Sequence, residues 1–174
     1  GERSDIGWNF ILREPYLRID QRLEVSYSVR ISGRELSRSG NQHELFLVNR
    51  VSSPDGEWLD EPHIVRHMLE NELPKDVQAE FVMRVVVQPG DYMLWSVLYD
   101  RKTGKHNVAK RRMRVPELRG DPLPGLYQKM PLVEFVETAD SNDGGFVKSQ
   151  LYLPVHNKHP LEIELISMLS PPEQ

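Results

Sequence analysis

The chain has 174 residues, of which 39% are hydrophobic and 28% charged, with a formal net charge of −4 at pH 7. This balance is typical of a soluble globular chain, and no apolar run approaches the ~18 residues that a membrane-spanning helix needs. The acidic excess argues against a general nucleic-acid binder, and the absence of cysteine excludes disulfides, thiol catalysis and thiolate metal sites.

Apolar residues recur at every second position through most of the first fifty residues. The stretches "WNFILRE" and "YLRI", separated by Pro15, predict a strand that is interrupted or switches sheets. Apolar and polar residues alternate in "RLEVSYSVRIS" (22–32), which predicts a strand with one solvent-exposed face. Next, "HELFLVNRVSS" (43–53) predicts a second strand, and "SPDG" (53–56) predicts a turn that leads through Trp58 into a short return strand.

One segment departs from this period. In "DEPHIVRHMLENELP" (60–74), the residues Ile64, Val65, Met68 and Leu69 fall on one helical stripe, with Pro62 in the first turn and Pro74 as the stop. This pattern predicts one short helix that crosses between sheets.

Two strands and a hairpin follow. "VQAEFVMRVVVQ" (77–88) places a row of apolar side chains on one side. "DYMLWSVLYD" (91–100) is apolar on both faces, which predicts a central strand that is covered on both sides. "DRKTGK" predicts a hairpin tip, where Gly104 supplies a positive φ.

The last third of the chain predicts a separate β-rich segment. "PLPG" (122–125) is typical of a linker, and three candidate strands follow it: "MPLVEFVE", "VKSQLYLPV" and "PLEIELISML". We therefore expect a sandwich over residues 1–118, a linker over 119–126, and a β segment over 127–174. That segment either docks on the sandwich or is part of a truncated second domain, since it is too small for independent stability.

The stretch "PGDYMLWSVLYDRKTGK" (89–105) resembles the penultimate and last strands of bacterial immunoglobulin-like and fibronectin-III-like sandwich domains. In those domains a turn, a tyrosine, an apolar strand and a D-x-x-T-G-K hairpin recur in that order. The resemblance implies an all-β protein with an Ig-like antiparallel β-sandwich. It makes Tyr92 the corner tyrosine, whose hydroxyl donates to a backbone carbonyl a few residues upstream, and it puts Leu94 where antibody domains have a disulfide cysteine.

A second resemblance rests on "DPLPGLYQKMPLVEFV" and "LYLPVHNKHPLEIEL". These stretches are similar to portions of exported bacterial proteins related to von Willebrand factor A domains. The D-x-S-x-S metal motif of those domains is absent, so no metal-dependent adhesion site is implied.

Histidine pairs are the first candidates for a metal site. His63 and His67 stand four apart on the expected helix, the spacing with which two imidazoles share a metal. Ile64 occupies the position where a metalloprotease needs its glutamate base, so we favour a solvated helix face. His156 and His159, in "HNKH", form a loop pair of similarly low value.

Acidic residues give no stronger signal. "DSNDGG" alternates Asp140 and Asn142, but Gly144 and Leu151 stand where a calcium loop needs its next ligands, so a flexible hairpin loop is preferred. The pairs Glu134 with Glu137 and Glu162 with Glu164 are what strands with a solvent-exposed face normally carry, and they are weak grounds for a glycosidase.

The basic run Lys110, Arg111, Arg112 and Arg114 has two interpretations. It could be a patch for an anionic partner. We prefer the other interpretation, in which Lys110, Arg112 and Arg114 point the same way along a final strand and protect an exposed sheet edge from pairing with another sheet.

No residue is assigned to catalysis, a cofactor or a metal. The expected function is a non-enzymatic interaction or scaffold module of an exported bacterial protein, periplasmic or secreted, with a protein or glycan partner and no nucleic acid. The alternative is an accessory β-domain of a hydrolase whose catalytic domain lies outside this chain. These functional expectations rest on fold-level resemblance.

Overall fold

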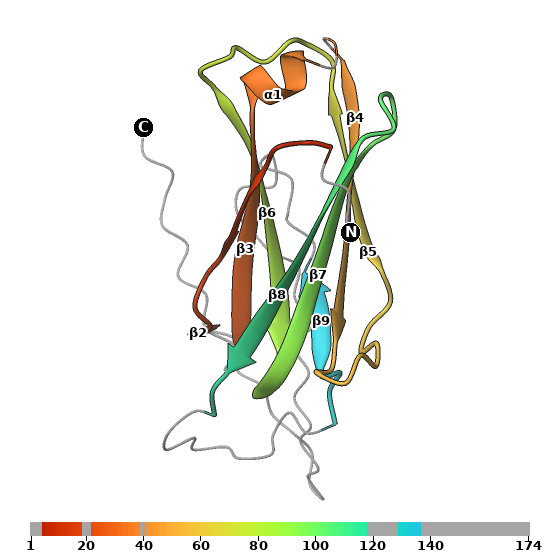
Figure 1. The fold of residues 1–174 in the computed structure, drawn as a ribbon. Coiled ribbons are helices and arrows are strands. Elements are labelled where there is room, and N and C mark those ends of the chain that lie inside the picture. Colours follow the sequence, from red (N-terminus) through yellow and green to blue (C-terminus); the bar gives the residue numbers. More distant parts are fainter. Residues whose placement is uncertain (1–4, 19–21, 39, 41, 118–128, 137–174) are drawn as a thin grey trace, which may run out of the picture.

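The protein is an all-β sandwich of two antiparallel sheets (Figure 1). The computed structural model describes residues 5–18, 22–38, 40, 42–117 and 129–136. In these ranges, sheet A has the strand order β1-β3-β6-β9, with β2 also paired to β3, and sheet B has the order β5-β4-β7-β8. The elements are β1 Asn9–Leu12, β2 Tyr16–Leu17, β3 Leu23–Ser32, α1 Gly33–Ser37, β4 His43–Ser52, β5 His63–Leu69, β6 Gln78–Val87, β7 Gly90–Asp100, β8 His106–Val115 and β9 Val133–Val136.

The core lies between the inner faces of the two sheets. Alternation along β3 turns every second side chain inward, and its ten residues pair with β6 from Leu23↔Val87 to Ser32↔Gln78. In sheet B, β4 pairs with β7, which puts Leu47 opposite Leu98. The fully buried side chains come from both sheets and include Val25, Tyr27, Val29, Ile31, Leu45, Leu47, Val51, Val85, Leu94 and Leu98.

The sequence predicts that the N-terminal strand is either interrupted at Pro15 or switches sheets there, and the structure shows the interruption. Both β1 and β2 pair with β3, so the chain stays in sheet A on either side of the proline. Pro15 has no N–H to donate, and it falls in the gap between the two pairings.

The helix predicted over residues 60–74 is wrong, because residues 63–69 of that segment form strand β5. The strand pairs with β4 along its whole length, from His43↔Leu69 to Asn49↔His63. Ile64 and Val65 are β-branched, which favours the extended conformation over the helical one. Pairing with β4 therefore decides the conformation.

The one helix among the described elements lies elsewhere, at α1, between β3 of sheet A and β4 of sheet B. Ser32 caps it, because its Oγ accepts the N–H of Glu35 at 3.2 Å. Gly33 packs tightly there: its N–H donates to the Val77 carbonyl at 2.8 Å, and a Cβ would overlap the Pro74 carbonyl oxygen. This five-residue helix is too short to span a membrane, and no longer apolar helix occurs in the described ranges.

Strand β9, from the predicted "MPLVEFVE", is the edge of sheet A beside β6. Phe135 of β9 stacks on His63 of β5 with ring centroids 4.8 Å apart, which brings the two sheets together along that side. The predicted linker and the other two candidate strands lie outside the described residues. The domain division therefore stays a prediction.

Candidate interaction surface

The outer face of sheet B carries apolar side chains that no described element covers. Strand β7 was expected to be covered on both sides, and it does lie in the middle of its sheet, between β4 and β8. Its inner side chains are buried, whereas Trp95 and Val97 on the outer face are only half-buried. Four further side chains of this face or its rim are more exposed: Ile64 at 57%, Met68 at 48%, Trp58 at 46% and Tyr99 at 39%.

Aromatic rings and cations alternate across the middle of this face. Arg50 of β4 and Lys110 of β8 are the cross-strand neighbours of Trp95. The Lys110 Nζ lies 4.2 Å from the Trp95 ring centroid, and the Arg50 Cζ lies 4.1 Å from that of Trp58. The two indoles meet edge to face at 5.9 Å. We call these four residues the aromatic–cation row.

Strand β8 contains the predicted basic run and is an edge of sheet B, as the favoured interpretation requires. Lys110, Arg111, Arg112 and Arg114 are all exposed. In the antiparallel register Lys110, Arg112 and Arg114 alternate with residues of the inner face, so they share the outer face.

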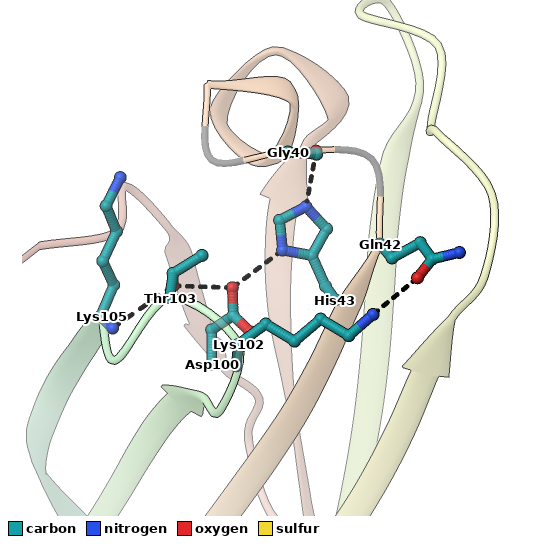
Figure 2. Close-up of polar contacts among 7 residues, drawn as sticks. All are labelled: Gly40, Gln42, His43, Asp100, Lys102, Thr103 and Lys105. Atoms are coloured by element: carbon teal, nitrogen blue, oxygen red, sulfur yellow. Dashed lines mark hydrogen bonds and ion pairs between the residues drawn. The ribbon is translucent and has the colours of Figure 1, made fainter.

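A buried polar cluster joins the beginning of β4 to the end of β7 (Figure 2). His43 begins β4, and its Nδ1 lies 2.8 Å from the Asp100 Oδ2 at the end of β7. The other ring nitrogen lies 3.1 Å from the Gly40 carbonyl oxygen. Asp100 also accepts the Thr103 hydroxyl at 2.8 Å and the Lys102 N–H at 3.1 Å. Asp100 thus organises the D-x-x-T-G-K hairpin, where Gly104 has the predicted positive φ of 70°.

This cluster has the residue types of a catalytic triad but not the arrangement. Both ring nitrogens of His43 lie against oxygen atoms within the protein, one of the Asp100 carboxylate and one of the Gly40 carbonyl, so neither faces a position that a substrate could occupy. The Thr103 hydroxyl donates to Asp100 and not to the histidine. A nucleophilic hydroxyl needs an adjacent base, and Thr103 has none. The cluster instead links the loop at Gly40 to the hairpin at Thr103.

Hydrogen bonding sets the ionisation of Asp100. Burial alone would raise its pKa, but the hydrogen bonds from His43, Thr103 and the Lys102 N–H outweigh burial and lower the pKa below its ordinary value of 3.8. Asp100 is therefore an ionised carboxylate with its acceptor sites occupied.

The predicted histidine pair is not a metal site or a solvated helix face. His63 and His67 are on strand β5, where residues four apart are separated by about 13 Å, too far to share one metal. His67 turns inward, with its ring 4.4 Å from that of Phe81, and burial lowers its pKa below 6.5. No group of three metal-ligating side chains is found in the described part of the chain.

The remaining sequence candidates divide between the described and undescribed residues. Glu134 accepts a hydrogen bond from Arg22 at 2.7 Å, an ion pair at the edge of sheet A. The other candidates lie outside the described residues: Glu137, Asp140, Asn142, Gly144, Leu151, His156, His159, Glu162 and Glu164.

Sequence reasoning missed the contact of His43 with Asp100 and two further features. Glu24 is a buried carboxylate on β3 that binds Arg18 at 3.0 Å and the hydroxyl of Tyr16, which fastens β2 to the sheet. It also missed the aromatic–cation row. A signal for the row was present, because Arg50 and Trp95 both fall at outward positions of strands that the sequence predicts.

No protein-family model and no curated protein matches the chain. Among solved structures, it is similar to the "Putative ApaA Protein" of Bordetella pertussis, with 11% identity and a TM-score of 0.39 over 66% of this chain and 98% of that one. It is also similar to the structural-genomics target SoR45, with 12% identity and a TM-score of 0.37 over 68% of this chain and 92% of that one. At this level the similarities bear on neither family nor function.

Proposed function

We propose that the chain is a non-enzymatic interaction module with an immunoglobulin-like or fibronectin-III-like sandwich, and that it is part of an exported bacterial protein. The strand order supports the fold assignment. Pairing of β3 with β6, and the order β5-β4-β7-β8, correspond to B-E and C′-C-F-G of that fold. Tyr92, near the start of β7, donates to the Gln88 carbonyl at 2.8 Å, as a corner tyrosine does. The extracytoplasmic setting rests on the resemblance alone.

The observation that carries the interaction role is the outer face of sheet B, which none of the described elements covers. Tryptophan, methionine and arginine are enriched at the centres of protein interfaces, and an exposed apolar patch rimmed by polar residues is typical of a binding surface. Trp58, Trp95, Met68 and Arg50 all lie on this face or at its rim.

A protein partner fits this face better than a glycan. Sugar stacking needs an open aromatic ring face, and Arg50 and Lys110 reduce the open ring area because each lies over one of the two indoles, Trp58 and Trp95. Tryptophan and arginine are also the residues that contribute most binding energy at protein interfaces. The engaged nitrogens of His43 support a non-enzymatic role, because the cluster that most resembles a catalytic site is used to hold two loops together.

Site-specific photo-cross-linking in the source cells tests the proposal. p-Benzoylphenylalanine replaces either Ile64, which is 57% exposed on the outer face of sheet B, or Val82, which is 42% exposed on the outer face of sheet A. We expect an intermolecular adduct with one protein from the Ile64 position, weakened by Trp58→Ala, and none from the Val82 position. Equal adducts from both positions, or adducts from Ile64 only within the chain, would contradict the proposal. A glycan array on which Trp58→Ala abolishes binding would replace the protein partner by a sugar.

A further inference from the structure

Strand β8 leaves part of the edge of sheet B open. At its beginning the N-terminal segment covers it: the Asp5 N–H donates to the His106 carbonyl at 2.8 Å, and the Asn107 side chain donates to the Ile6 carbonyl at 2.6 Å. From residue 108 to 115, the backbone–backbone hydrogen bonds among the described residues run to β7 alone, and the Lys110 carbonyl accepts the guanidinium of the neighbouring Arg111 at 3.0 Å. In the described part of the chain, no strand pairs with the backbone groups of this stretch that point away from β7, and a further strand would replace the exposed Arg111 side chain at the Lys110 carbonyl.

The same stretch has more positive charge than the neighbouring acids neutralise. The one described carboxylate within 4 Å of the four β8 cations is Asp91, which lies 3.1 Å from Arg112 in an exposed pair. Lys110 contacts the Trp95 ring, and Arg111 lies 5.6 Å from the Phe10 ring centroid. In a chain with a formal net charge of −4, this is a local basic strip.

The spacing of the cations matches an extended polypeptide. Lys110, Arg112 and Arg114 share the outer face, so neighbouring side chains are about 7 Å apart. A strand paired to this edge presents its own alternate side chains at the same interval, opposite or diagonal to the cations. A second copy of β8 would put Lys and Arg against Lys and Arg, which is destabilising. A strand with Asp or Glu at alternate positions would form opposite-charge pairs.

We propose that residues 108–115 of β8 bind an extended acidic segment of another protein by strand addition. The inference rests on the proposed interaction role and specifies the chemistry of the partner. The cations that prevent self-pairing of this edge then also select the partner. Backbone hydrogen bonds supply affinity, and the charges on the outer face supply specificity and register.

A strand partner is favoured over an anionic polysaccharide because the two features coincide. A polyanion uses only the charges, whereas an extended peptide uses both the open backbone edge and the charges spaced along it. The order of residues within a peptide of constant composition and charge therefore discriminates between strand pairing and simple charge attraction.

The test measures binding of capped peptides of about ten residues, a common strand length, to the full-length chain by fluorescence anisotropy. One peptide alternates Glu and Val. A second has the same composition with all Glu residues in one block, and a third is the alternating peptide with backbone N-methyl groups at every second residue. We expect the alternating peptide to bind, and the blocked and methylated peptides to bind about tenfold more weakly or not at all.

Variants of the chain supply the second arm. The triple change Lys110→Glu, Arg112→Glu, Arg114→Glu should weaken the alternating peptide by about tenfold or more. A control with the same charge change at exposed positions off β8, Arg13→Glu, Arg34→Glu, Lys75→Glu, should bind as the wild type does. Asp91→Asn frees Arg112 from its pair and should tighten binding.

Two results would overturn strand addition: no binding of the alternating peptide, or equal binding of the alternating and blocked peptides. The proposed function has its own test, because the photo-cross-linking experiment can contradict it whatever the peptides do. If the Ile64 position captures a protein and the peptides do not bind, the acidic strand is rejected and the interaction role remains.

Discussion

The Tyr92 hydroxyl donates to the Gln88 carbonyl at 2.8 Å and so links the start of β7 to the end of β6, the two strands that run in different sheets. The ring is buried at the end of the core. Removing only the hydroxyl, as Tyr92→Phe, leaves the carbonyl without this donor and should lower the free energy of unfolding by about 1–3 kcal/mol. Urea unfolding with equal m-values measures the loss. A change below about 0.5 kcal/mol would mean that the bond holds little of the corner together.

Gly33 should tolerate no side chain. A Cβ there would overlap the Pro74 carbonyl oxygen, and the neighbouring backbone cannot move without disturbing the Gly33 N–H bond to Val77. We expect Gly33→Ala to lower the free energy of unfolding by about 1–3 kcal/mol. Gly7→Ala is the matched control, because a Cβ at Gly7 meets only the Glu35 side chain at 3.4 Å. Equal thermal stability of the two variants would show that the loop before β6 adapts freely.

The ionised Asp100 predicts a loss of stability in acid. Its folded pKa lies below 3.8, so the stability that it contributes is present above that value and is lost as the pH falls through the folded pKa. Asp100→Asn should cost about 1–3 kcal/mol near pH 6, since it removes the charged acceptor of the hydrogen bonds with His43, Thr103 and the Lys102 N–H. The difference from the wild type should shrink below pH 3.8 in urea unfolding at a series of pH values. A difference that is constant with pH would show that the charge of Asp100 contributes nothing.

His67 should titrate below its ordinary value. Burial lowers its pKa from 6.5, so the unfolded chain binds this proton more readily than the folded one. Stability linked to His67 is therefore complete above pH 6.5 and declines as the pH falls through its folded pKa. The ring-proton NMR titration of the folded chain measures the midpoint directly. A midpoint at or above 6.5 would mean that the ring is solvated and not packed against Phe81.

Strands in which apolar and polar residues alternate clearly were predictable from the sequence. Strand β5, which was predicted as a helix, shows where prediction from local sequence fails. In β3, apolar and polar residues alternate over all ten residues, a pattern that no helix imitates. In β5, the order Ile64, Val65, Met68, Leu69 fits a helical stripe as well as a strand with two apolar faces. Pairing with β4, a contact between distant residues, decides between them. A local signal for the real helix existed in the Ser-x-x-Glu of Ser32 and Glu35, which is a capping pattern.

The candidate surface was only partly predictable. Alternation within β8 put Lys110, Arg112 and Arg114 on one face, and their place on an edge strand follows the preferred interpretation. The meeting of Trp58 with Trp95 could not be read from the sequence, because it depends on the register of β4 against β7 and on the turn after Ser53. The clamp of His43 on Asp100 joins residues 57 apart and was equally invisible.

Hydroxyl-radical footprinting of the full-length chain tests most directly whether the outer face of sheet B is uncovered. The chain contains its own reference residues: Met68 on that face is 48% exposed, whereas Met83 and Met113 in the core are 3% and 2% exposed. Methionine oxidation follows exposure. An uncovered face predicts that Met68 oxidises about tenfold or more faster than Met83 and Met113, with Trp58 also modified rapidly. Oxidation of Met68 as slow as that of Met113 would mean that this face is covered within the chain itself, and it would contradict the interaction surface.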